Sequence, residues 1–262
     1  MALSQNMLFF DTNYGEWASV TGVNLHTETA MYAYDNRSSN LVDFSTCTGE
    51  FVYDFGTDGY YNLNTWIIAN HNLVDFNVQN YTGTAWYTVT AYSNNSATTN
   101  YYNNASTSTQ ITDTKIVFTK TVNSDPAYFG EFIATKKKFQ LNYNPSTYVP
   151  SINPVGISKT LWDGRSVFNQ RSDAFSANLG WGFLIGDANT LTNTDLQNVT
   201  ELFRKKTSFL FWPNADNTFP NMFTWRKQDI YKCKCLEAVN YEFPAAGLTY
   251  IVKANYTIRE VN

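Results

Sequence analysis

The chain has 262 residues and a formal net charge of −4, and its aromatic residues (17%) outnumber its charged residues (15%). A chain of this length can bury a core without disulfide or metal staples, and it suits two modest domains. The acidic balance gives no basic field for a phosphate backbone, and no apolar run approaches the roughly 20 residues that span a bilayer. The composition therefore excludes nucleic acid as a partner and excludes membrane insertion.

The first half of the chain contains a series of short apolar runs separated by Gly and Asn turns. They lie at 51–56, 65–69, 76–78, 86–89, 115–119 and 129–134. Aromatic and β-branched residues dominate them, and turn chemistry rather than helix-length segments separates them. We predict an antiparallel β-sandwich with Trp66 or Ile67 in its core. The start of the chain, Met1 to Asn6, lacks the cationic end of a signal peptide, so we expect the protein to stay in the cytoplasm until assembly.

A polar segment from Tyr92 to Thr114 consists almost entirely of Asn, Ser, Thr, Ala and Tyr. It predicts a long surface loop, which we expect to order against a partner through Tyr101 and Tyr102. Tyr60 and Tyr61 lie in a predicted turn. Because exposed aromatic rings anchor interfaces and stack on sugars, these four tyrosines are our candidates for protein or glycan contact.

Prolines at positions 145, 150 and 154 mark a change in organisation. This density of proline forbids a helix and disfavours a central strand. We therefore predict a sandwich domain at 1–143, a proline-rich linker at 144–154 and a mainly β domain at 155–262, in a β-sandwich-like arrangement with one short helix.

The second half contains strand-like runs at 165–175 and 181–185 and then a predicted helix at 194–206. Thr194 and Gln197 fit a capping box. One face of the helix is apolar, with Leu196, Val199, Leu202 and Phe203. The helix should lie against a sheet. Near the end, Val252, Ala254, Tyr256 and Ile258 alternate with polar residues, which predicts a half-buried antiparallel strand.

Three cysteines, Cys47, Cys233 and Cys235, are too few for a disulfide framework. Cys233 and Cys235 flank one lysine in a strand-like run, so both thiols should share one face of a sheet. We interpret them as buried, reduced side chains. The alternative, a zinc site, lacks further ligands because His26 and His71 show no ligand spacing. We expect no metal and no cofactor.

The sequence offers weak candidates for catalysis or ion binding. His71 lies between two asparagines without a recognisable nucleophile, so we interpret it as a turn residue. Asp54 and Asp58 could form a glycosidase pair, but strand-end and turn hydrogen bonding explains both. A run of possible calcium ligands at 187–195 fails the standard loop spacing, and the lead-in to a helix explains it. We expect no catalytic residue and no enzymatic activity.

The N-terminal half resembles discoidin-like (galactose-binding-like) domains over about residues 30–140. The resemblance is carried by four segments in order: Tyr53 to Gly56, Trp66 to Leu73, Val78-Gln79 and Thr82 to Trp86. The runs at 115–119 and 130–134 are similar to that family's final strands. The resemblance implies a jelly-roll sandwich.

The turn from Ala69 to Leu73 is similar to the version found in bacteriophage tail structural proteins, in which a second domain follows. Gly164-Arg165, the predicted helix and Phe209 to Trp212 approximate that second domain. The resemblance implies a non-enzymatic virion component of a tail tip, baseplate or tail surface. Its partners would be other tail proteins and copies of itself, assembled in the host cytoplasm. The alternative is a carbohydrate-recognition module for host attachment, and a glycan-active enzyme would need paired carboxylates that the sequence does not place.

Overall fold

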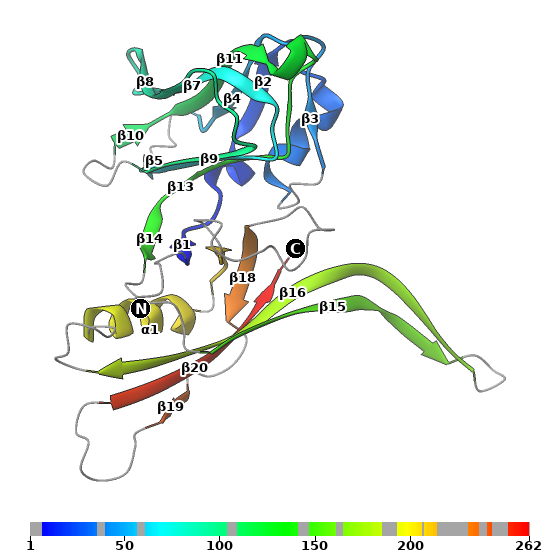
Figure 1. The fold of residues 1–262 in the computed structure, drawn as a ribbon, viewed down its shortest axis with the longest axis vertical. Coiled ribbons are helices and arrows are strands. Elements are labelled where there is room, and N and C mark those ends of the chain that lie inside the picture. Colours follow the sequence, from blue (N-terminus) through cyan, green and yellow to red (C-terminus); the bar gives the residue numbers. More distant parts are fainter. Residues whose placement is uncertain are drawn as a thin grey trace. The chain divides into compact units, whose positions relative to one another are not determined.

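The computed structural model describes residues 7–35, 40–56, 61–103, 109–140, 147–160, 165–184, 193–205, 207–213, 230–235, 240–242 and 251–261. The protein is mainly β, as predicted, and its sheets are antiparallel (Figure 1). The chain divides into two compact units. The N-terminal unit contains Phe10–Lys138 and Pro220–Ile230, and the C-terminal unit contains Met1–Phe9, Phe139–Phe219 and Tyr231–Asn262.

The N-terminal unit is a sandwich of two main sheets. The larger sheet has the order β2 (Ser19–Val23), β4 (Gly49–Asp54), β11 (Asp113–Thr121), β7 (Leu73–Tyr81) and β8 (Trp86–Tyr92). The smaller has the order β13 (Glu131–Thr135), β6 (Thr65–Ala69) and β9 (Thr99–Asn103). Two short strand pairs join β10 (Thr109–Ile111) to β5 (Tyr61–Leu63) and β12 (Tyr128–Phe129) to β3 (Val42–Asp43). Three 3-10 helices, η1 (Tyr14–Trp17), η2 (Thr27–Tyr34) and η3 (Val122–Ser124), complete the unit.

The burial pattern explains why these segments form strands. All residues of β6 are buried, which suits the central strand of its sheet. Along β7, buried and half-buried residues alternate for most of the strand, which is typical of a strand with one face on the core. Trp66 and Ile67 are both buried. The predicted antiparallel sandwich is therefore confirmed.

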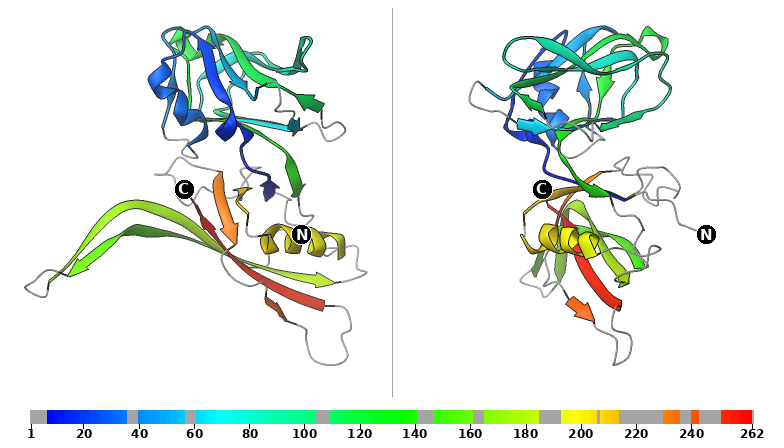
Figure 2. Two further views of the ribbon diagram at one scale, coloured as in Figure 1. Left: turned by 180° about the vertical axis from the view of Figure 1, so that it is seen from behind. Right: turned by 90° about the vertical axis from the view of Figure 1, so that its left-hand side faces the viewer.

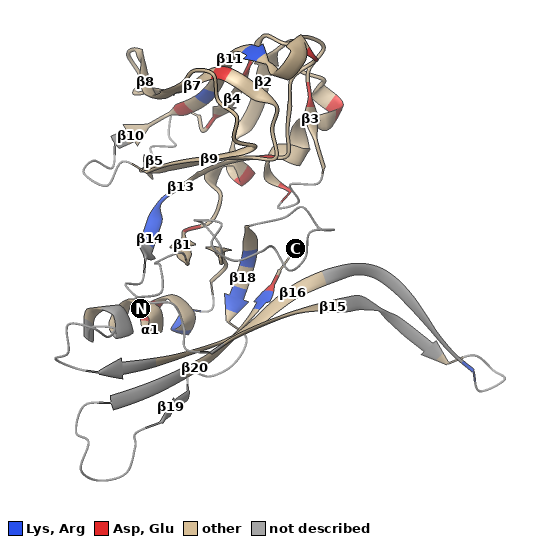
Figure 3. Ribbon diagram, viewed as in Figure 1, with Lys and Arg blue, Asp and Glu red and all other residues tan. Residues whose placement is uncertain are grey.

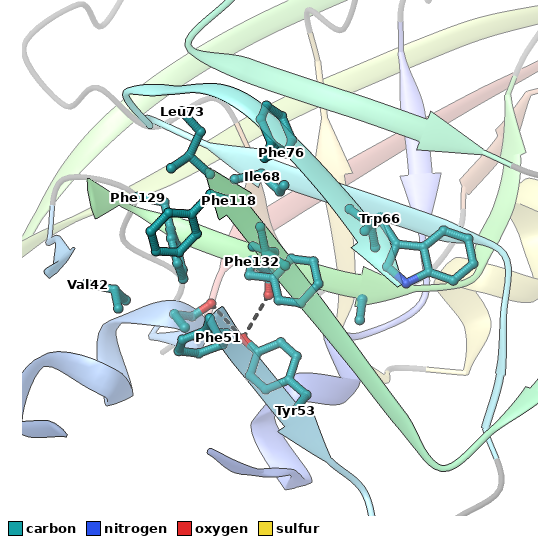
Figure 4. Packing of buried hydrophobic residues seen from close by; sticks show 14 of the residues in the cluster. Val42, Phe51, Tyr53, Trp66, Ile68, Leu73, Phe76, Phe118, Phe129 and Phe132 are labelled. Carbon is teal, nitrogen blue, oxygen red and sulfur yellow. Dashed lines mark hydrogen bonds between the residues drawn. The ribbon is translucent and has the colours of Figure 1, made fainter. Parts of the chain in front are cut away.

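Aromatic side chains from both sheets fill the core between them (Figure 4). The Tyr53 ring stacks on Phe132, with centroids 5.1 Å apart, and Phe51 meets both rings edge-on. The buried Tyr53 hydroxyl lies 3.0 Å from the Ala33 carbonyl oxygen and 2.8 Å from that of Phe132. A Cβ at Gly15 would come within 2.4 Å of the Tyr53 ring, so this close approach requires glycine.

The prediction of a long loop from Tyr92 to Thr114 is wrong, because β9 and β10 lie within this segment. Residues 104–108 fall outside the described part of the chain. β9 pairs with β6 along its whole length, so Tyr101 lies opposite Ile67 and Tyr102 opposite Trp66. Backbone pairing with the buried, apolar β6 stabilises β9 despite its polar composition. Strand propensity calculated from the residues of β9 alone cannot reveal this pairing.

The C-terminal unit contains one large sheet, which is antiparallel in each strand pair with a described register, and the only α-helix of the described residues. The sheet order is β14 (Lys137–Gln140), β1 (Leu8–Phe10), β17 (Phe209–Trp212), β18 (Tyr231–Cys235), β20 (Ile251–Glu260), β16 (Ser166–Leu184) and β15 (Thr147–Thr160), and β19 (Asn240–Glu242) also pairs with β20. The helix, α1, spans Asn193–Arg204.

The helix α1 packs against the sheet, as predicted. Val199, Leu202 and Phe203 are buried. The Phe203 ring lies 4.6 Å from that of Tyr256 and 6.1 Å from that of Phe9. The helix begins at Asn193, so the predicted cap, Thr194, lies inside its first turn. The predicted last residue, Lys206, lies outside the described residues.

Two predicted boundaries need correction. From Thr147 onwards the predicted linker forms the first half of β15, while 141–146 lie outside the described residues. β15 is the last strand in its sheet order, and an edge strand tolerates proline because one side of its ladder has no partner. The segment Met1–Phe9, predicted to belong to the first domain, belongs to the C-terminal unit. Most of the runs predicted at 165–175 and 181–185 lies in one strand, β16 (Ser166–Leu184), and residue 185 is outside the described residues.

The predicted faces of the last strands are confirmed where side chains are described. Cys233 and Cys235 are buried in β18 and alternate with half-buried lysines, and the three cysteines form no disulfide. In β20, Tyr256 and Ile258 are buried and Arg259 is exposed. No helix in the described part of the chain is long and apolar enough to span a membrane.

Candidate functional site

The larger sheet of the N-terminal unit has one face on the core and one face turned away from it. In β11, Thr114, Ile116 and Phe118 are buried, and the residues that alternate with them, including Asp113 and Lys115, are half-buried. Successive side chains of a strand point to opposite faces. Asp113 and Lys115 therefore lie on the face turned away from the core, which we call the outer face.

One end of the outer face carries a continuous row of side chains, one from each strand. The strand register places Ser19 opposite Asp54, Asp54 opposite Asp113, Asp113 opposite Tyr81, and Tyr81 opposite Trp86. Residues directly opposite each other share a face of the sheet. We call these five residues the end row. Four strand spacings of about 4.8 Å give the row a length of roughly 19 Å.

The β8 side of the end row is aromatic. The Trp86 side chain is 39% exposed, and its ring centroid lies 5.3 Å from that of Tyr81. The Lys115 Nζ lies 4.4 Å from the Trp86 ring centroid and 2.6 Å from Glu50 Oε2. A cation over an indole face is attracted by the ring quadrupole. The lysine is thus held between a carboxylate and the indole, and it restrains both side chains.

The centre of the end row carries two carboxylates on neighbouring strands. Asp54 Oδ1 accepts a hydrogen bond from the Gly56 N–H (2.7 Å), and Asp113 Oδ2 accepts one from the Thr112 hydroxyl (2.8 Å). Among the described residues, the other oxygen of each carboxylate has no hydrogen-bond partner. Burial raises the pKa of Asp113, and the nearby Asp54 charge raises that pKa further. Like charges directly opposite destabilise a sheet, so the structure alone gains nothing from this pair.

The end row therefore joins an aromatic platform to a group of hydrogen-bond acceptors on an open sheet face. Aromatic faces pack against apolar ring faces, and carboxylate oxygens accept hydrogen bonds from hydroxyl groups. Charged residues of both signs lie on β4, β7 and β11, whereas β8 carries none (Figure 3). Within the described ranges, no group of three or more His, Cys, Asp or Glu side chains could hold a metal ion.

The structure does not place the predicted tyrosines in exposed loops. Tyr60 lies outside the described residues. Tyr61 is half-buried in β5, with its ring 4.8 Å from that of Tyr14. Tyr101 and Tyr102 are half-buried in β9, and burial raises the pKa of Tyr101 to about 12. The three described rings pack on rings of their own unit, so the expectation of exposure is wrong for them, and their role in any contact stays a prediction.

His71 occupies a buried turn between β6 and β7. Its Nδ1 accepts a hydrogen bond from the Leu73 N–H (3.1 Å), so its Nε2 carries the proton and donates to Asn100 Oδ1 (2.7 Å). Burial lowers the pKa of His71 to about 4. These contacts support the interpretation as a turn residue. Of the other weak candidates, Asp58 and positions 187–192 lie outside the described residues.

Comparison with known proteins finds similarity only to solved structures, since no family and no curated protein matches the sequence. One is chitosan-binding module 1 of a chitosanase/glucanase from Paenibacillus sp. IK-5, at 13% identity, covering 45% of this chain and 94% of that chain, with a TM-score of 0.40. Another is CpGH89CBM32-4 from Clostridium perfringens, in complex with glcNAc-alpha-1,4-galactose, at 15% identity, covering 51% and 97%, with a TM-score of 0.41. A third is a Ruminococcus gnavus GH29 fucosidase in complex with fucose, at 16% identity, covering 48% and 27%, with a TM-score of 0.41. Values this low assign no residue of this chain to a known site.

Sequence reasoning missed the end row as a group. Trp86 was named as the start of a strand and as part of the family resemblance, and Asp54 was considered only with Asp58 or as a strand-end residue, never with Asp113. The available signal was the hairpin around Gly83, because a tight turn places the residues that flank it on opposing strands. That signal joins Tyr81 to Trp86 but cannot reach the more distant strands.

Proposed function

We propose that this chain is a non-enzymatic carbohydrate-recognition protein whose N-terminal unit binds a neutral glycan along the end row. The observation that carries this proposal is the alignment of an exposed Trp86, packed beside Tyr81, with the acceptor oxygens of Asp54 and Asp113 on one face of one sheet. Sugar rings present apolar C–H faces and hydroxyl donors together, and the end row offers a partner for each.

The geometry also favours a bound ring at Trp86 over one at the other exposed aromatic residues. Trp86 is restrained by Tyr81 and by the Lys115 ammonium, so little side-chain entropy remains to be lost on binding. The amide of Gln79 and the hydroxyl of Thr88, opposite each other in the register, lie two residues further along the same face. They extend the set of polar groups beside the aromatic platform.

Titration of the purified protein with oligosaccharides tests the proposal, after a glycan array has selected the ligand. We expect Trp86→Ala to weaken binding by tenfold or more, because losing about 1.4 kcal/mol of stacking raises Kd by that factor. We expect Asp113→Asn to weaken it less, since an amide oxygen still accepts a hydrogen bond. The melting temperature should change little for either variant.

Tyr87→Ala is the matched control. Tyr87 is the next residue of β8 and is nearly as exposed as Trp86 (37% against 39%), but it lies opposite the buried Asn80 and points away from the outer face. The Tyr87→Ala variant should bind the selected glycan with the affinity of the parent protein. Binding by Trp86→Ala at the parent affinity would contradict the proposal, as would a screen in which no glycan binds. Release of reducing ends from the bound glycan, lost in Asp113→Asn, would contradict the non-enzymatic assignment.

A second candidate function is that of an assembly subunit, as the bacteriophage tail resemblance implies. The observation that favours it is the length of the β15–β16 hairpin, which extends beyond its own sheet. Such a protein would act through contacts with other virion components and with copies of itself. Electron microscopy of the concentrated protein tests this candidate, with ordered rings or fibres expected and featureless single particles contradicting it.

A further inference from the structure

The β15–β16 hairpin is longer than the sheet that holds it. β15 pairs with β16 from Thr147 opposite Gly180 out to Thr160 opposite Ser166. On its other side, β16 pairs with β20 only from Ser176 to Leu184. Among the described strands, Val155–Thr160 and Ser166–Ser172 thus form a ribbon with no third strand, which we call the arm. Figures 1 and 2 show this ribbon extending away from the rest of its sheet.

A two-stranded ribbon of this kind is marginally stable by itself in water. The six residues that β15 contributes to the arm, Val155–Thr160, span roughly 20 Å at about 3.3 Å per residue. Each of its edges presents backbone N–H and C=O groups at alternate residues, and such edges pair readily with another strand. The arm is therefore a template for strand addition.

One edge of β15 has no neighbouring strand among the described residues, and we call it the outer edge. The prolines of β15 divide this edge into two parts. Pro150 lies opposite Ala177 and Pro154 opposite Asp173. A proline fits a strand only where its missing N–H would have pointed to the open edge, and residues an even number of positions apart point to the same edge. Both prolines therefore remove donors from the outer edge near the body of the sheet. No proline follows Pro154 in β15, so the outer edge of the arm keeps all of its donors.

We infer that the outer edge of the arm pairs with the same edge of a second copy of this chain, antiparallel and about a two-fold axis. The segment Val155–Thr160 contains one charged residue, Lys159. In a two-fold register centred on Ile157, Lys159 lies opposite Val155 of the other copy, so no like charges oppose each other. A two-fold contact also closes on itself and buries the edge on both copies. This inference does not depend on glycan binding.

Ser158→Pro tests the pairing directly. Ser158 lies an even number of positions from Pro150 and Pro154. The register irregularity between Val155 and Gly156 adds its extra residue to β16, so the alternation along β15 is not interrupted. The N–H of Ser158 therefore points to the outer edge. Proline there removes a donor for the second copy and leaves the β15–β16 ladder intact. Ser158→Ala is the matched control, because it removes the same hydroxyl and keeps the N–H.

The measurement is sedimentation equilibrium of the full chain over a concentration series up to hundreds of micromolar. We expect the parent and Ser158→Ala to rise from the 29.8 kDa monomer towards twice that mass, and Ser158→Pro to shift the midpoint at least tenfold higher in concentration. Hydrogen exchange at Val155–Thr160 should slow with concentration in the first two proteins only. A parent that stays monomeric throughout would overturn the inference, as would a dimer that Ser158→Pro leaves unchanged.

Discussion

Replacing Phe9 with alanine is expected to lower the free energy of unfolding of the C-terminal unit by about 3–5 kcal/mol, the usual cost of truncating a buried phenylalanine. The Phe9 side chain is fully buried, and its ring contacts the rings of Phe203, Phe209 and Phe211 at centroid distances of 5.1–6.2 Å. The truncation would open a cavity between α1, β1 and β17. Because these elements lie in different parts of the chain, the cavity cannot collapse without moving the helix.

Urea denaturation followed by the near-ultraviolet signal is the appropriate measurement. Trp17→Ala is a suitable control, since this residue is another aromatic side chain but is 59% exposed, and it should change the stability by no more than about 0.5 kcal/mol. Phe9→Leu should fall between the two. A loss below about 1 kcal/mol for Phe9→Ala would show that β1 is not packed as described.

Lowering the pH from 6.5 to about 4 is expected to destabilise the N-terminal unit through His71. The pKa of the buried imidazole is about 4 in the folded state and about 6.5 in an unfolded chain. Between these values the unfolded state binds the proton and the folded state does not, so the free energy of unfolding falls as the pH falls. The full effect is on the order of 3 kcal/mol, and it is absent above pH 6.5.

The chain provides its own control for this experiment, because it has only two histidines. His71→Gln should lower stability at pH 7, since it disturbs the bonds to Leu73 and Asn100, but it should flatten the slope between pH 6.5 and 4. His26→Gln is the matched control variant, because it is the same substitution at a side chain that is 46% exposed rather than buried. Equal slopes in the parent and His71→Gln would show that carboxylates alone set the acid sensitivity.

The elements that could be predicted from the sequence are those whose own residues show the hydrophobic pattern of a strand or a helix. Thr65–Ala69 is buried on both faces and reads as a continuous apolar run, and α1 has a buried stripe at helical spacing. β9 was missed because its stability comes from pairing with β6 rather than from its own composition. The sequence also could not predict that Pro150 and Pro154 lie in an edge strand, because this depends on the order of strands in the sheet.

The candidate site was less predictable than the fold for the same physical reason. Its residues come from five strands that span Ser19 to Asp113 in the sequence. Only the register of the whole sheet brings Asp54 beside Asp113, and a shift of one residue in any strand would turn its member of the end row towards the core. Composition and local patterning contain no information on register across four strand pairs.

The position of β1 affects how the chain can be synthesised. The strand β1 (Leu8–Phe10) leaves the ribosome about 200 residues before its neighbour β17, which starts at Phe209, so this length of chain must follow before the two can pair. During that interval the N-terminal sandwich can form, whereas Phe9 lacks its ring partners Phe203, Phe209 and Phe211. Chaperones that bind short apolar segments would find one at this position. A nascent chain that stops before β17 would keep this apolar segment exposed and would be prone to aggregation.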